Sequence, residues 1–144
     1  MSTALSPLQE QQHEAMDRLE CEIARTPEPE TTLIHHFADG LYGRELHLPK
    51  GAILTGKTHR GRTLNIIPKG KILVSAVGEA SRVIEAPACF VSEAGARRAG
   101  LALEDTIWIN VHASEETDLV KLEAQLIEPH TNPMLDYETR RIKQ

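Results

Sequence analysis

Aromatic residues make up only 3% of this 144-residue chain. A stacking platform for nucleic-acid bases needs several aromatic rings, so the composition disfavours one. The formal net charge is −5 and the isoelectric point is about 5.8, which disfavours broad binding to nucleic acid or to anionic membranes. A local cluster of basic residues is still compatible with the binding of a single small anion.

Cysteine is also scarce, and long apolar runs are missing. The two cysteines, Cys21 and Cys89, lie far apart and share no metal-binding or redox spacing, so we expect two reduced thiols in a cytoplasmic protein. No apolar run approaches the length of a membrane span. The N-terminal sequence MSTALSPLQEQQ lacks the basic and then apolar segments of a secretion signal.

Hydrophobic residues at 40% and charged residues at 26% are ordinary for a soluble globular protein. The length fits one domain with short appendages. We expect an N-terminal helix with a Pro/Glu-rich linker over residues 1–30 and a β-barrel over 31–113. A C-terminal helix and a polar tail then occupy 114–144.

The N-terminal segment is predicted to be a helix over residues 6–25. Ser6 can cap it, Pro7 suits its first turn, and Gln9 completes a capping box. Its apolar stripe is thin, and the linker TPEPE that follows is stiff. We therefore expect this helix to dock outside its own barrel, on a neighbouring subunit or an assembly partner.

The central region reads as short strands separated by turns that contain Gly, Pro or Asp. Many short strands at a spacing of about eight to twelve residues are typical of an all-β sandwich or barrel. After the last strand, an apolar helical face precedes Pro129, which predicts a second helix. The predicted strands are 32–37, 41–48, 52–58, 63–67, 72–77, 82–85, 89–92, 97–101 and 106–112.

The stretch GAILTGKTHRGRTLNIIPKG begins at Gly51 and ends at Gly70. Its glycine spacing resembles the first motif of cupin barrels. Further stretches (HHFADGLYGREL, LPKGAIL, EAPACF, ALEDTIW and VHASEETDL) resemble a small cupin family that is common in phage genomes and their bacterial relatives. The resemblance covers residues 33–129 and implies a cupin jelly-roll barrel.

The resemblance also implies four metal-ligand positions, which this chain fills with Lys57, His59, Thr63 and Arg98. Ammonium and hydroxyl groups are poor ligands for a transition ion at neutral pH, and one histidine cannot hold a metal alone. We therefore predict no bound metal and no cofactor. His112 shares a strand face with Trp108 and can either complement His59 or bond to the loop after the strand.

Five basic residues lie in the Gly51–Gly70 motif or in the second motif that the resemblance implies, residues 93–98: Lys57, Arg60, Arg62, Arg97 and Arg98. If Lys57 and Arg98 project inward, they repel each other unless they are paired. Either Glu45, Glu85 or Glu93 neutralises them, or the barrel holds a phosphate or carboxylate. The candidate pocket residues are Lys57, His59, Thr63, Arg98 and His112.

No Ser or Cys lies in a context that favours nucleophilic catalysis. The resemblance and the missing ligands favour a non-enzymatic, oligomeric structural or assembly component of a virion, found in a host cytoplasm or in the virion. Its expected partners are further copies of the chain and other phage structural proteins, with no membrane or nucleic acid. Two alternatives stay open: a module that binds a small anion in the barrel, and a metal enzyme built around His59 and His112.

Overall fold

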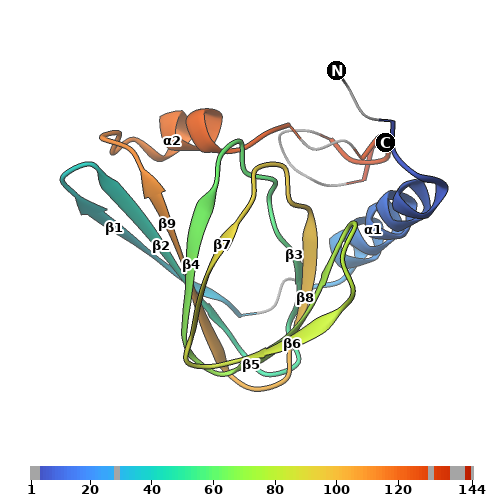
Figure 1. Cartoon of the computed structure of the whole chain (residues 1–144), viewed down its shortest axis with the longest axis horizontal. Coiled ribbons are helices and arrows are strands. Elements are labelled where there is room, and N and C mark those ends of the chain that lie inside the picture. The colour runs from blue at the N-terminus through green and yellow to red at the C-terminus, as the bar shows by residue number, and fades with distance from the viewer. Residues whose placement is uncertain (1–3, 28–29, 130–131, 137–141, 144) are drawn as a thin grey trace.

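The computed structural model describes residues 4–27, 30–129, 132–136 and 142–143. Two antiparallel sheets face each other, and one helix lies at each end of the described chain (Figure 1). One sheet has the strand order β1-β2-β9-β4-β7 and the other the order β3-β8-β5-β6. The predicted all-β jelly roll with two flanking helices is confirmed. The elements are α1 (Pro7–Arg25), β1 (Thr32–Ala38), β2 (Leu41–Leu48), β3 (Ile53–Thr55), β4 (Thr63–Lys69), β5 (Lys71–Ala76), β6 (Arg82–Glu85), β7 (Ala88–Ser92), β8 (Arg98–Ala102), β9 (Thr106–Ala113) and α2 (Leu119–Leu126).

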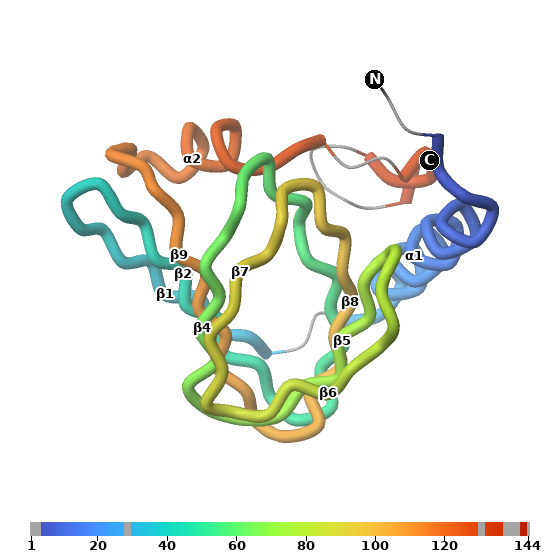
Figure 2. The backbone as a smooth tube through the Cα atoms, viewed as in Figure 1, coloured from blue at the N-terminus to red at the C-terminus, as the bar shows by residue number. Residues whose placement is uncertain are grey.

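The strands follow the predicted pattern with one clear difference, in the segment predicted as 52–58. Strand β3 ends at Thr55, and the chain then runs as a loop to β4. The backbone tube in Figure 2 shows this connection rising to the end of the barrel that α2 covers. The loop is where Lys57 and His59 lie, so these side chains come from the rim of the barrel.

The side chains that point into the barrel are apolar at its closed end and polar toward its open end. Strands β2 and β9 pair Leu46 with Trp108, Arg44 with Asn110 and Tyr42 with His112. Because side chains on one face of a strand recur every second residue, all six point into the barrel. The closed end is filled by a core that includes Leu48, Ile67, Ile72, Val74 and Ala102. The polar half of the interior therefore lies toward the open end.

Gly70 joins β4 to β5 at the closed end of the barrel. Its φ is +104°, a conformation that side-chain-bearing residues rarely adopt. A Cβ at this position would overlap Thr106. The Thr106 hydroxyl donates to Glu104 O at 2.8 Å and lies close to the Lys71 backbone, so the last glycine of the motif lets two hairpin ends pack closely.

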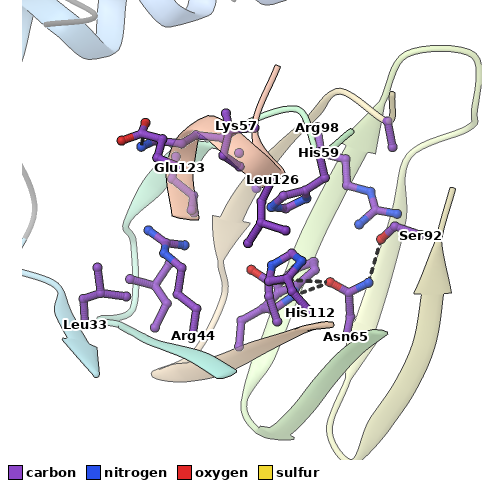
Figure 3. Close-up of a pocket in the computed structure, with 18 of the residues that line it drawn as sticks. Leu33, Arg44, Lys57, His59, Asn65, Ser92, Arg98, His112, Glu123 and Leu126 are labelled. Atoms are coloured by element: carbon purple, nitrogen blue, oxygen red, sulfur yellow. Dashed lines mark hydrogen bonds and ion pairs between the residues drawn. The ribbon is translucent and has the colours of Figure 1, made fainter. Parts of the chain in front are cut away.

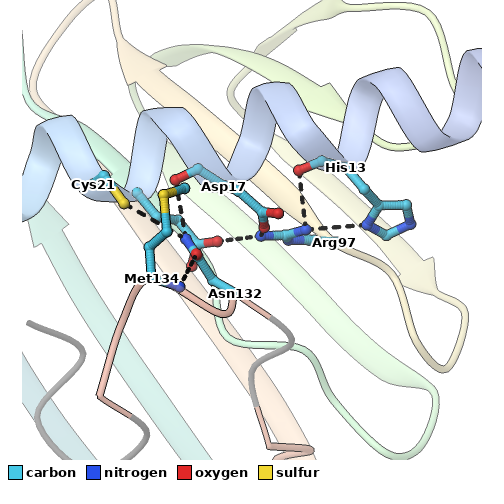
Figure 4. A network of polar contacts seen from close by, with 7 residues as sticks. His13, Asp17, Cys21, Arg97, Asn132 and Met134 are labelled. Atoms are coloured by element: carbon cyan, nitrogen blue, oxygen red, sulfur yellow. Dashed lines mark hydrogen bonds and ion pairs between the residues drawn. The ribbon is translucent and has the colours of Figure 1, made fainter. Parts of the chain in front are cut away.

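The N-terminal helix α1 packs on its own barrel, so the prediction that it docks elsewhere is wrong. The capping box is present, with Gln9 N donating to Ser6 Oγ at 3.1 Å. Buried Arg97 reaches the helix, where it pairs with Asp17 at 2.6 Å and with Glu20 (Figure 4). Parts of the TPEPE linker and of the predicted polar tail lie outside the described residues.

Helix α2 covers the open end of the barrel (Figure 1). Asp118 caps it by accepting from Lys121 N at 3.0 Å. Two backbone hydrogen bonds, Arg60 N to Leu126 O and Glu128 N to Thr58 O, both 2.8 Å, tie the end of the helix to the loop after β3. Within the described residues, no helix is long and apolar enough to span a membrane.

The outer face of the five-stranded sheet is apolar across three strands. Antiparallel register aligns Val111, Leu64 and Val91 in one row, and Ile109, Ile66 and Cys89 in the next. Leu64 and Val91 are exposed. At one side of this face, on β2, Glu45 bonds to His36 and His47 at 3.0 and 2.5 Å, so a polar cluster flanks the apolar rows there.

A cationic cavity in the barrel

A cavity of about 350 Å³ lies between the two sheets and below α2. Its lower part is apolar, with Leu46, Leu54, Ile72, Val74 and Trp108. Leu122 and Leu126 of α2 close it from above. Its polar side chains come from both sheets, from the loop after β3 and from α2 (Figure 3). The cavity therefore offers an apolar floor and a polar upper half.

Two guanidinium groups enter this cavity from opposite sheets, Arg44 from β2 and Arg98 from β8. Burial lowers the pKa of Arg98; nearby Glu79 opposes this effect and Arg82 adds to it. Burial also lowers the pKa of Arg44, and Tyr42 and Glu123 oppose that shift. In the part of the chain that the structure describes, neither arginine forms an ion pair.

Arg98 is held in place by an aromatic ring rather than by a carboxylate. Its guanidinium carbon lies 5.7 Å from the centroid of the Phe90 ring. The Arg82 guanidinium lies 5.3 Å from the same centroid. A ring face orients a cation, and it leaves the N–H groups of the guanidinium free to meet an acceptor.

Lys57 lies at the rim and pairs with Glu123 of α2 at 2.5 Å. One of the two alternatives from the sequence was that Glu45, Glu85 or Glu93 neutralises the basic cluster; none of the three pairs with Lys57, although Glu93 pairs with Arg62. Glu45 bonds to His36 and His47, and Glu93 pairs with Arg62 at 3.3 Å. The ion pair of Lys57 therefore links the loop after β3 to the helix that covers the cavity.

His59 and His112 face each other in the upper cavity, with ring centroids 4.8 Å apart. The pKa of His59 is lowered to about 4, first by burial and then by the nearby His112, Arg44, Arg98 and Lys57. Burial, with Arg44, also lowers the pKa of His112. Both rings are therefore neutral at pH 7 and can donate or accept hydrogen bonds.

The two readings left open for His112 are now separated. Its ring packs against Tyr42 and His59. None of the described residues forms a hydrogen bond with its side chain, including those of the following loop. The structure therefore does not support the hydrogen bond to the following loop, and it places the two rings side by side; a joint role of His112 and His59 in binding stays a prediction.

A buried amide, Asn65, organises the far wall of the cavity. Its Oδ1 accepts from Trp108 Nε1 at 2.9 Å and from Asn110 Nδ2 at 2.7 Å. Its Nδ2 donates to Ser92 Oγ at 2.6 Å. Four side chains from three neighbouring strands are thus joined by one amide.

The structure places four of the five predicted pocket residues on the cavity wall: Lys57, His59, Arg98 and His112. Thr63 does not line the cavity; it is 1% exposed, and its hydroxyl has no partner among the described residues. Of the wider basic cluster, Arg97 turns outward to α1 and Arg62 pairs with Glu93 on the surface. The spacing of the motif does not by itself show which of these residues face the cavity and which face away from it.

Sequence reasoning did not name Arg44, Asn65, Ser92 or Asn110 as pocket residues, and all four line the cavity. Each lies within a strand that was predicted, but faces were assigned from the sequence only for the last strand, 106–112. Tyr42 and Arg44 share a face of β2, as do Trp108 and Asn110 on β9. A polar residue at an inward-facing strand position was the sequence signal that could have identified them as cavity residues.

No protein-family model matches the chain, and no curated protein matches it at a significant level. Solved structures do match. KdgF from Halomonas sp. aligns with a TM-score of 0.51 and 20% identity, covering 61% of this chain and 83% of that chain. A cupin superfamily protein from Desulfitobacterium hafniense aligns with a TM-score of 0.51 and 11% identity, covering 61% of this chain and 81% of that one. The fold is cupin-like. A cupin-like protein from Thermotoga maritima is similar in the same way, with a TM-score of 0.51, 13% identity and coverage of 60% and 70%.

The metal that the cupin resemblance implies does not fit the residues present here. Of the four ligand positions, only His59 supplies a metal-binding group. The described residues contain no cluster of three or more His, Cys, Asp or Glu side chains arranged to hold a metal ion. Arg44, Lys57 and Arg98 surround the two histidines with positive charge, which opposes the binding of a cation.

Proposed function

We propose that the barrel is a non-enzymatic binding site for a small organic anion. The observation that carries this proposal is the pair of cavity guanidiniums, Arg44 and Arg98, neither of which has an ion-pair partner among the described residues. A charge taken out of water without a partner is costly. A carboxylate or phosphate between the two sheets would remove that cost through charge-assisted hydrogen bonds.

The apolar lower half of the cavity supports an organic anion over a bare inorganic one. Leu46, Leu54 and Val74 offer no polar group there, so a hydrocarbon portion of the ligand would bury apolar surface against them. A volume of about 350 Å³ lies at the lower end of the range for small-molecule sites.

Helix α2 lies over this site, and in this proposal it moves when a ligand enters. Its leucines close the cavity, and the Lys57–Glu123 ion pair holds it to the loop after β3. The glutamate also lowers the net positive charge of the rim. In this proposal α2 covers the site, and the carboxylate of Glu123 competes with the ligand for Lys57.

Thermal unfolding with hexanoate or inorganic phosphate, each at constant ionic strength, tests the proposal. A ligand that binds only the folded protein raises the melting temperature in proportion to the logarithm of its concentration. We expect hexanoate to stabilise the wild-type protein, and Arg98→Met to abolish the effect. Arg62→Met is the matched control, since Arg62 lies on the surface. The proposal fails if neither anion stabilises the wild type, or if Arg98→Met responds like Arg62→Met.

The role of a virion-associated assembly component rests on the resemblance to phage proteins and stays a prediction. The similar solved structures carry the fold and leave the phage origin untested. The structure removes one of its supports, because α1 does not extend from its own barrel.

We also propose that the protein is a homo-oligomer, formed through the apolar outer face of the five-stranded sheet rather than through α1. Val111, Leu64 and Val91 form an uncharged row there. An uncharged face can meet a copy of itself across a two-fold axis without repulsion. Val91→Glu should lower the mass measured by light scattering, whereas Val83→Glu, at an equally exposed valine of the other sheet, should not. A monomeric wild type would overturn this assignment.

A further inference from the structure

Trp108 determines which atoms donate and which accept hydrogen bonds along the far wall of the cavity. Indole Nε1 can only donate, so the atom of Asn65 that faces Trp108 at 2.9 Å must be Oδ1. The other end of the amide, Nδ2, then faces Ser92 Oγ at 2.6 Å. The orientation of Asn65 is therefore set by chemistry as well as by geometry.

This orientation determines what the two neighbours present to the cavity. Asn110 must direct its NH₂ group at Asn65 Oδ1, at 2.7 Å, which leaves Asn110 Oδ1 as an acceptor. Ser92 Oγ already accepts from Asn65, so its own proton is available to donate. Both side chains line the cavity. Among the described residues, none donates to Asn110 Oδ1 and none accepts from the Ser92 hydroxyl.

A free acceptor and a free donor on one wall match a ligand hydroxyl, which can give and take a hydrogen bond at once. A second carboxylate does not match, because it cannot donate to Asn110. An apolar group leaves both side chains without partners, which is unfavourable in a closed site.

Resting on the proposed function, we infer that the ligand is a hydroxy acid. Its anionic group meets the guanidiniums of Arg44 and Arg98, and a hydroxyl meets Asn110 and Ser92. The hydrocarbon between them lies on the apolar floor. The guanidiniums, the Asn110–Ser92 pair and the apolar floor come from different elements of the barrel. The distances between them therefore determine which carbon of the ligand must carry the hydroxyl.

Isothermal titration calorimetry with matched six-carbon acids tests the inference. The probes are hexanoate and its 2-, 3-, 4-, 5- and 6-hydroxy derivatives, which share one charge and one carbon chain. We expect at least one hydroxy isomer to bind at least tenfold more tightly than hexanoate. In Ser92→Ala and in Asn110→Ala this ratio should fall below threefold. Ser75→Ala is the matched control, because Ser75 bonds to Ser81 outside the cavity and should leave the ratio unchanged.

The outcomes separate the two proposals. If hexanoate and every hydroxy isomer bind equally well and Arg98→Met abolishes binding of all of them, the anion site stands and the hydroxyl inference is overturned. If a hydroxy isomer is favoured but Ser92→Ala and Asn110→Ala keep the full ratio, the inference is also overturned. If none of the acids binds, the proposed function itself fails.

Discussion

The imidazole rings of His59 and His112 lie 4.8 Å apart between the guanidiniums of Arg44 and Arg98. One ring comes from a loop at the rim and the other from the end of β9. Two uncharged rings in a cationic cavity make the site responsive to protons, because each added proton raises the positive charge that meets an anion.

The stability of the protein should fall in mild acid because of His59. Its pKa is 6.5 in the unfolded chain and about 4 in the folded protein, so between these values only the unfolded chain binds the proton. The free energy of unfolding should be unaffected by His59 above pH 6.5. It should then fall as the pH drops toward 4. Urea unfolding at several pH values measures this slope, and His59→Gln should make it shallower. Equal slopes for the two proteins would contradict the prediction.

Arg98→Met should stabilise the ligand-free protein by about 0.5–2 kcal/mol, because it removes a desolvated charge that has no carboxylate partner in the described chain. The methionine keeps contact with Phe90. The measurement is the free energy of unfolding in urea without added anion. A loss of more than about 1 kcal/mol would show that Arg98 is a structural residue of the barrel.

Arg97→Met should destabilise the protein by about 3–5 kcal/mol. The arginine is 9% exposed and bonds to Asp17 and Glu20 of α1, and its loss leaves two acidic groups close together under the helix. Arg62→Met is the control, since its pair with Glu93 is exposed and 3.3 Å long; it should change stability by less than about 0.5 kcal/mol. Similar losses in both variants would be inconsistent with a buried anchor.

Gly70→Ala should cost at least about 2 kcal/mol more than Gly95→Ala. Both glycines have positive φ, +104° and +79°, but a Cβ at Gly70 overlaps Thr106 while one at Gly95 meets open space. Thermal unfolding of the two variants measures this difference, which combines the overlap with Thr106 and the greater departure of φ from the left-handed region at Gly70. Equal melting temperatures would show that the β4–β5 turn can move away from β9.

The sequence predicted the fold well because the signals for it are local. Alternation and turn residues gave the strands, and the box formed by Ser6 and Gln9 gave the start of α1. The site was predicted in part. Lys57, His59 and Arg98 follow from the metal-ligand positions, whereas Arg44 lies in a stretch that carries the resemblance but no ligand position.

The partners of the charged residues were beyond sequence reasoning. Glu123 is 66 residues from Lys57 and Asp17 is 80 residues from Arg97. Such pairs form only once each helix has packed on the barrel, and the sequence pattern does not give that packing. The docking of α1 was misjudged for the same reason: its thin apolar stripe was weighed, but the buried Arg97 in the loop before β8 was not.

The anchor of α1 also has a consequence for biosynthesis. Asn132 Nδ2 donates to the backbone oxygen of Asp17 at 3.0 Å across 115 residues of sequence, and Arg97 reaches the same helix across 77 to 84 residues. Helix α1 precedes both Arg97 and Asn132 in the chain. During translation the helix therefore lacks these two contacts until 80 and 115 further residues after Asp17 have been added.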